Sequence, residues 1–141
     1  MSLAKNASGT LLKYGTGASA GSVATIPECT KITAPNVKFD LIDVTSHDST
    51  GYFREFLPGL ADGENVTAQF FFVPTNTVHK LLRTDAYART IGSYRIVFTD
   101  SGTGNQMDAN AYTVGFQPTA DINTALTCAL TAKVTGQPTW T

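Results

Sequence analysis

The clearest pattern in the chain is a strict alternation of apolar and polar residues near its C-terminus. Between residues 125 and 135 the apolar positions are Leu126, Cys128, Leu130, Ala132 and Val134. The positions between them are Thr127, Ala129, Thr131 and Lys133. Because successive side chains of a strand point to opposite faces of a sheet, this pattern predicts a half-buried β-strand. Shorter runs rich in β-branched and aromatic residues predict further strands at 22–33, 37–45, 65–73, 93–99 and 111–118.

One segment has the periodicity of a helix. Residues 77–89 carry an apolar stripe made of Val78, Leu81, Leu82 and Ala86. Asn76 or Thr75 can cap its start, and Gly92 can end it. One helix among six or seven strands predicts a mainly β fold, a β-sandwich or barrel with one flanking α-helix.

The first 21 residues lack a strand pattern. They are polar and rich in glycine and serine, and their only apolar anchors are Leu11, Leu12 and Tyr14. Such a segment has little to pack against within its own domain, so we expect an extended N-terminal arm that is disordered or ordered by a neighbouring molecule. The chain is then divided into this arm, 1–21, and a single β domain, 22–141.

The predicted strands at 37–45 and 65–73 are separated by a connection far longer than the usual hairpin loop of about two to five residues. The segment from Asp43 to Leu60 combines aromatic, aliphatic and charged side chains: Asp43, His47, Asp48, Tyr52, Phe53, Arg54, Glu55, Phe56, Leu57 and Leu60. Exposed aromatic residues rimmed by charges are typical of an interaction surface. The alternative is a long loop that folds back over its own core.

Composition favours a protein that is covered by partners. Only 15% of the 141 residues are charged, against about 25% in typical soluble domains. The net charge of −1 excludes the basic excess of a tight nucleic-acid binder. The chain has neither the run of about 20 apolar residues that spans a bilayer nor an apolar signal-peptide core within residues 1–21. We therefore expect cytoplasmic synthesis without membrane insertion, with Cys29 and Cys128 as free thiols.

Few residues suggest catalysis. His47 and Asp48, close to Asp43, can be drawn as a metal or acid–base cluster, and a small hydrolase using His47, Asp48 and Glu55 is the catalytic alternative. His79, beside Lys80 on the predicted helix, is expected to be a solvated surface residue. The sequence contains no CxxC, HExxH or GxSxG motif. We therefore predict no enzyme activity, no metal and no cofactor.

A resemblance to a known family adds to this interpretation. Residues 39–59, FDLIDVTSHDSTGYFREFLPG, resemble the corresponding segment of major tail tube proteins of long, non-contractile-tailed, lambda-like bacteriophages. The strand at 66–74 and the helix at 78–89 follow in the expected order. The C-terminal half is similar as well, with YRIVF at 94–98 and VTGQP at 134–138. The resemblance spans about residues 22 to 138.

The resemblance implies a structural subunit of the virion, assembled in the bacterial cytoplasm. Hexameric rings would stack into a hollow tube through which viral DNA passes during ejection. The segment from Asp43 to Leu60 would contact the neighbouring ring, and Leu11, Leu12 and Tyr14 would make the arm contacts. The implied partners are other copies of the chain and the tape measure, tail tip and terminator proteins. One alternative is the inner tube of a contractile injection or type VI secretion apparatus. The other is a surface β-sandwich that binds carbohydrate or protein, although the sequence does not show the secretion signal that such a module needs.

The geometry of a ring agrees with this implication. Six subunits that each supply four tilted strands give a barrel with a circumference of roughly 150 Å and a bore of roughly 38 Å. A lumen of weakly charged residues would let DNA slide, whereas many cations would hold its phosphates. The lumen candidates are Lys38, Asp40, Thr127, Thr131 and Lys133. The alternative is that this face lies outside the tube or under the helix.

Overall fold

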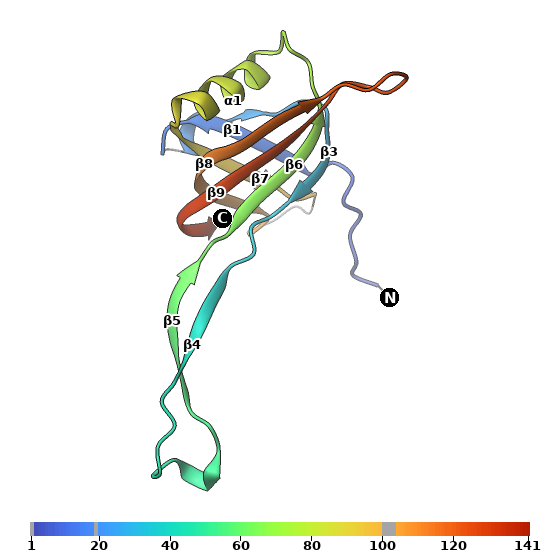
Figure 1. Cartoon of the computed structure of the whole chain (residues 1–141). Helices are drawn as coiled ribbons and strands as arrows, with labels where there is room; N and C mark the ends of the chain where they lie inside the picture. The colour runs from blue at the N-terminus through green and yellow to red at the C-terminus, as the bar shows by residue number, and fades with distance from the viewer. Residues whose placement is uncertain (1, 19, 100–103) are drawn as a thin grey trace.

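The computed structural model describes residues 2–18, 20–99 and 104–141 (Figure 1). The strands are β1 (Leu11–Thr16), β2 (Ala24–Thr25), β3 (Cys29–Thr33), β4 (Lys38–Asp43), β5 (Phe56–Asp62), β6 (Asn65–Phe71), β7 (Ile91–Val97), β8 (Gln106–Thr119) and β9 (Thr127–Trp140). The helix is α1 (Thr77–Ala88), and two short 3₁₀ turns are η1 (Ala20–Ser22) and η2 (Thr50–Tyr52).

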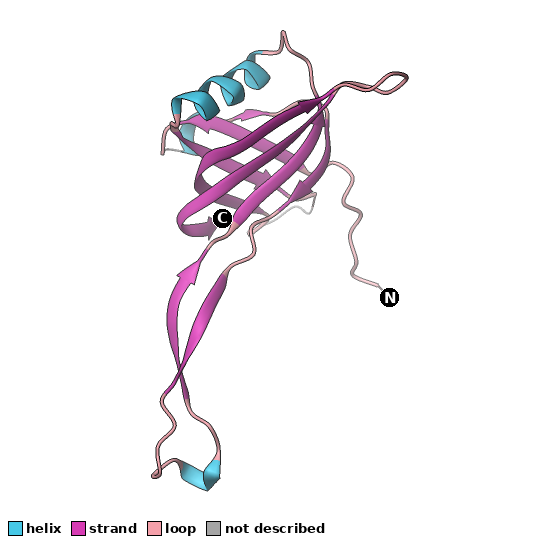
Figure 2. Ribbon diagram, viewed as in Figure 1, coloured by secondary structure: helices cyan, strands magenta, loops and turns pink. Residues whose placement is uncertain are grey.

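Seven of the strands form one curled antiparallel sheet in the order β2-β1-β7-β8-β9-β6-β3. The helix α1 covers one end of the curl, and β4 and β5 form a separate two-stranded ribbon that projects from the body (Figures 1 and 2). The prediction of a mainly β fold with one flanking helix is confirmed.

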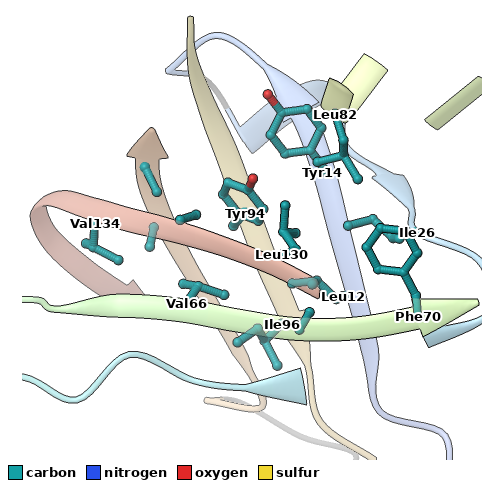
Figure 3. Close-up of a cluster of buried hydrophobic side chains, with 14 of the residues drawn as sticks. Leu12, Tyr14, Ile26, Val66, Phe70, Leu82, Tyr94, Ile96, Leu130 and Val134 are labelled. Atoms are coloured by element: carbon teal, nitrogen blue, oxygen red, sulfur yellow. The ribbon is translucent and has the colours of Figure 1, made fainter. Parts of the chain in front are cut away.

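The core lies inside the curl. Side chains from β1, β6, β7, β9 and α1 point into one cluster, which Figure 3 draws. The predicted alternation of the last strand is confirmed, because Cys128, Leu130, Ala132 and Val134 are all buried while Ala129 is exposed. One face of the large sheet is therefore apolar and enclosed, and the other faces outward.

The helix begins where its sequence predicts. The side chain of Asn76 accepts hydrogen bonds from the backbone N–H groups of Val78 and His79, at 2.9 and 3.3 Å. The helix ends earlier than expected, because Arg89 adopts a left-handed conformation with φ 58° and closes it. Gly92 has another role. It lies in β7, where a Cβ atom would overlap the ring of Tyr14.

The expectation of an N-terminal arm up to residue 21 is wrong for its second half. Residues 11–16 form β1, which pairs with β2 and β7 inside the large sheet. Leu12 and Tyr14 are core residues with 0% and 1% exposure, so they cannot make the predicted contacts with a neighbour. Leu11, at 39% exposure, remains accessible. The Tyr14 hydroxyl donates to the carboxylate of Asp85 at 2.6 Å, which ties β1 to the helix.

The long connection after β4 is also not a loop throughout. Its second half forms β5, which pairs with β4 in the register Asp43↔Phe56, Ile42↔Leu57 and Leu41↔Pro58. Only residues 44–55 remain as the turn of this hairpin, and η2 lies within it. The segment becomes an extended hairpin of residues 37–62 instead of an irregular loop, and it does not fold back over its own core (Figure 1).

The two cysteines are free thiols, as expected, on strands that flank β6: Cys29 and Cys128 both pair in register with Phe70. Burial raises the pKa of each thiol from 9.0 to about 11. Between pH 9 and pH 11 the folded protein therefore binds more protons than the unfolded chain, and stability must fall as the pH rises.

We expect the free energy of unfolding to decrease as the pH is raised through this window, as measured by urea denaturation at several pH values. The variant Cys29→Ala with Cys128→Ala should lose less stability over the same range. Buried Tyr14 and Tyr94, whose pKa values burial also raises, extend the decline to higher pH. A flat profile from pH 9 to pH 11 would contradict the burial of the thiols.

Candidate functional site

Among the residues that the structure describes, the hairpin of residues 37–62 carries the largest group of exposed apolar side chains. Its large hydrophobic side chains are all at least 41% exposed: Val37, Phe39, Leu41, Ile42, Val44, Tyr52, Phe53, Phe56, Leu57 and Leu60. Tyr52 and Leu60 are the extremes, at 103% and 93%. A contiguous exposed apolar surface of this kind marks an interaction site.

Hydrogen bonds hold the tip of the hairpin in a defined shape. The side chain of Asp43 accepts from the backbone N–H of Thr45 at 2.9 Å. Hydrogen bonding from the side chain of Thr45, together with that from its backbone, lowers the pKa of Asp43. The Thr45 hydroxyl accepts from the N–H of Glu55 at 2.8 Å, and the Ser49 hydroxyl donates to the Glu55 carboxylate at 2.9 Å. The polar residues therefore order the turn, while the aromatic ring of Phe53 remains exposed.

Two ion pairs fix the root of the hairpin to the large sheet. Lys133 on β9 contacts both carboxylate oxygens of Asp62, at 2.7 and 2.9 Å. Lys38 contacts Glu64 at 2.8 Å. The hydrogen bond from Lys133 lowers the pKa of Asp62, and that with Glu64 raises the pKa of Lys38. Exposed pairs of this kind are screened by solvent and contribute little to stability, so they orient the hairpin more than they stabilise the fold.

Close packing at the turn between β5 and β6 completes the root. Gly63 is buried, and a Cβ at this position would come within 2.8 Å of the Val134 side chain. The next residue, Glu64, has φ 52° and accepts from the N–H of Val134 at 2.9 Å. Strand β5 of the hairpin thus runs through this turn directly into β6 of the large sheet.

The structure places all ten residues predicted for the interaction segment on this hairpin. His47, Asp48, Tyr52, Phe53, Arg54 and Glu55 lie in the turn, Asp43 ends β4, and Phe56, Leu57 and Leu60 belong to β5. The carboxylate of Glu55, which the hydrolase alternative would use, accepts a hydrogen bond from the Ser49 hydroxyl. Among the described residues, no group of three His, Cys, Asp or Glu could hold a metal ion.

The prediction for His79 is wrong. Its side chain is fully buried, and its ring lies 4.6 Å from that of Phe70, centre to centre. Its Nδ1 accepts from the backbone N–H of Val73 at 3.1 Å, and its Nε2 lies 3.3 Å from the carbonyl oxygen of Pro27. This histidine joins three segments of the fold and has a structural role.

The outward face of the large sheet is a second candidate surface. Its residues follow from the strand register, which gives one cross-strand row of Thr33, Thr67 and Thr131 and another of Lys31, Gln69 and Ala129. These residues line a shallow depression of about 190 Å³. The face is polar and carries the cations Lys31, which is exposed, and Lys133, which is paired with Asp62.

The five lumen candidates do not share one face. Thr127, Thr131 and Lys133 lie on the outward side of β9, opposite the buried Cys128 and Leu130. Lys38 and Asp40 lie on β4 of the projecting hairpin. Sequence reasoning missed Thr33, Thr67 and Gln69, although the alternation of Val66, Ala68 and Phe70 on β6 would have indicated the last two.

Across the described residues, no helix has the length and apolar character needed to cross a membrane. No protein-family model matches the sequence. No characterised protein matches it significantly either. Comparison of folds is more informative.

Several solved structures share the fold at low sequence identity. A chain from the tail of an empty gene transfer agent particle, refined with helical C6 symmetry, matches with a TM-score of 0.80 at 17% identity, covering 98% of this chain and 99% of that one. A chain of the six-fold symmetrised baseplate of the anti-feeding prophage matches with a TM-score of 0.72 at 9% identity, covering 100% and 97%. A chain of the SPP1 tail tube matches with a TM-score of 0.67 at 11% identity, covering 90% and 73%.

Proposed function

We propose that this chain is the structural subunit of a phage-type tail tube, in which hexameric rings stack into a hollow conduit. The observation that carries the proposal is the match of nearly the whole fold to a subunit of a six-fold symmetric tail. Its role is mechanical rather than catalytic. The tape measure, tail tip and terminator proteins are the partners that such a tube requires.

The exposed hairpin supports self-assembly. Its apolar side chains have no binding surface on their own body, because the ribbon projects away from it (Figure 1). In a stack of rings, the hairpin of one subunit can reach a neighbouring copy, and burying its side chains there would drive association. The accessible Leu11 and the segment before it can add contacts at the same stage.

The outward sheet face supports the passage of DNA. Its threonine and glutamine side chains offer a hydrated surface. Of its cations Lys31 and Lys133, the second is paired with Asp62, so few positive charges face the channel to hold phosphates. We therefore assign Thr127, Thr131 and Lys133 to the lumen. We assign Lys38 and Asp40, which lie on the hairpin, to contacts between subunits.

A tube of a contractile injection apparatus is the second candidate, because the fold also matches the anti-feeding prophage chain. The non-contractile phage tail remains our preferred assignment on the basis of the segment at 39–59. The genes beside this one distinguish the two, since a contractile apparatus requires a gene for a sheath protein.

Electron microscopy of the purified protein tests the proposal. We expect rings or tubes with six-fold symmetry and a central channel. A protein that remains monomeric over a wide range of concentration, salt and pH, while folded by circular dichroism, would contradict the proposed function.

A further inference from the structure

The curled sheet is open on one side, and a groove of about 790 Å³ lies in this opening. It is bounded by the N-terminal segment 5–10 on one side and by β3 on the other. Its apolar lining comes from Cys29, Ile32 and Phe98, which pack against the core without being fully buried. Since β3 is the last strand of the sheet, the groove is accessible from that edge.

The groove carries a positive charge on its β3 wall. Lys31 lines it there, and among the described lining residues there is no carboxylate. The side chains that suit it are therefore apolar groups accompanied by negative charge. A narrow element is needed as well, because a broad surface could not enter between the two walls.

The hairpin has these properties. Between residues 39 and 61 there is one cationic side chain, Arg54, and there are four acidic ones, so the net charge is −3. The acidic residues are Asp40, Asp43, Asp48 and Glu55. The net charge of the whole chain is −1, so the residues outside this segment carry a net charge of +2. The hairpin is a two-stranded ribbon whose apolar side chains are exposed on both faces.

We propose that the hairpin of one copy binds in this groove of a second copy. Aromatic side chains of the tip pack against Ile32 and Phe98, and the acidic side chains of the tip lie near Lys31. The occupant is a second copy because the hairpin points away from its own body (Figure 1). This inference rests on the proposed self-assembly and names the surface that receives the hairpin.

The contact is head to tail, because the hairpin and the groove are different surfaces of one chain. Such a contact does not close as a symmetric dimer but continues from copy to copy into a ring or a filament. Each copy both donates a hairpin and accepts one. A variant that loses only one of these functions should therefore still use the other.

Two full-length variants separate donation from acceptance. Tyr52→Ser with Phe53→Ser removes two exposed aromatic rings from the hairpin and leaves the groove intact. Lys31→Glu reverses a charge in the groove and leaves the hairpin intact. Lys80→Glu, a reversal at an exposed position of α1, is the matched control and should assemble like the unmodified protein.

We expect each of the two variants alone to lose every species larger than a monomer in sedimentation and native mass spectrometry, with an unchanged thermal midpoint. Mixed in equal amounts, they should form a dimer with one copy of each. The groove assignment is overturned if the Lys31→Glu variant assembles normally, or if the mixture gives no dimer while the unmodified protein polymerises. It is also overturned if the hairpin variant assembles, since another segment then fills the groove. Failure of the unmodified protein to assemble would instead overturn the proposed function.

Discussion

Replacing Phe56 and Leu57 together by alanine is expected to give a folded monomer that does not polymerise. The two side chains are 46% and 55% exposed, so their removal leaves no cavity in the core. As neighbours on β5 they point to opposite faces of the ribbon, and the double variant removes apolar surface from both. Complete burial of an exposed side chain of this size contributes about 1.5–3 kcal/mol, and about half of that when half of it is already covered.

The loss in assembly is large because it recurs in every subunit. Two half-exposed side chains per copy contribute about 1.5–3 kcal/mol, which corresponds to a shift of roughly 10-fold to 100-fold in the concentration needed for association. Sedimentation and electron microscopy measure this shift, and circular dichroism tests the fold. The conservative variant Phe56→Leu with Leu57→Ile keeps the apolar surface and should still assemble. Tubes of normal length from the alanine variant would show that the hairpin is not the contact.

The hairpin also shows which features of this fold its sequence can reveal. A strand is recognised by alternation when one of its faces is buried, as in β9. The ribbon of β4 and β5 has no buried face, so nothing requires its residues to alternate. It also contains Pro58 and Gly59, which usually interrupt a strand. Here Pro58 is tolerated, because it removes a single N–H group from a ribbon of two strands, in which each strand has a partner on one side only.

The first strand was missed for a different reason. Its glycines suggested a flexible arm, because glycine is common in loops. In the structure Gly15 is required by close packing, since a Cβ there would lie 2.5 Å from the carbonyl oxygen of Ser22. The apolar residues of β1, Leu12 and Tyr14, are too few to give a periodic pattern. They become buried only when β1 pairs with β7, which is far away in the sequence.

The three surfaces differ in how far the sequence predicts them. The exposed aromatic residues of the hairpin follow from the composition of its segment, and the outward face of β9 follows from its alternation. The groove could not be predicted, because its walls come from residues 5–10, 29–32 and 98–99, which only the curl of the sheet brings together. His79 was misassigned in the same way, because the backbone groups of Val73 and Pro27 that it contacts belong to other segments.

The largest loss of stability is expected from Phe70→Ala. Phe70 is fully buried on β6, and its ring lies 4.6 Å from that of His79 and 6.4 Å from that of Phe116. Removing it leaves a cavity between the sheet and the helix, so the free energy of unfolding should fall by about 3–5 kcal/mol. Chemical denaturation measures this change directly, and it is a large part of the total of about 5–15 kcal/mol.

The neighbouring phenylalanine is the matched control. Phe71 follows on the same strand but points to the outward face and is 41% exposed, so Phe71→Ala should cost less than about 1 kcal/mol. The same chemical change at adjacent positions thus separates the two faces of the sheet. Equal losses at both positions would mean that the outward face is covered within the monomer. In that case it could not line an open channel, and the assignment of Thr127, Thr131 and Lys133 to the lumen would fail with it.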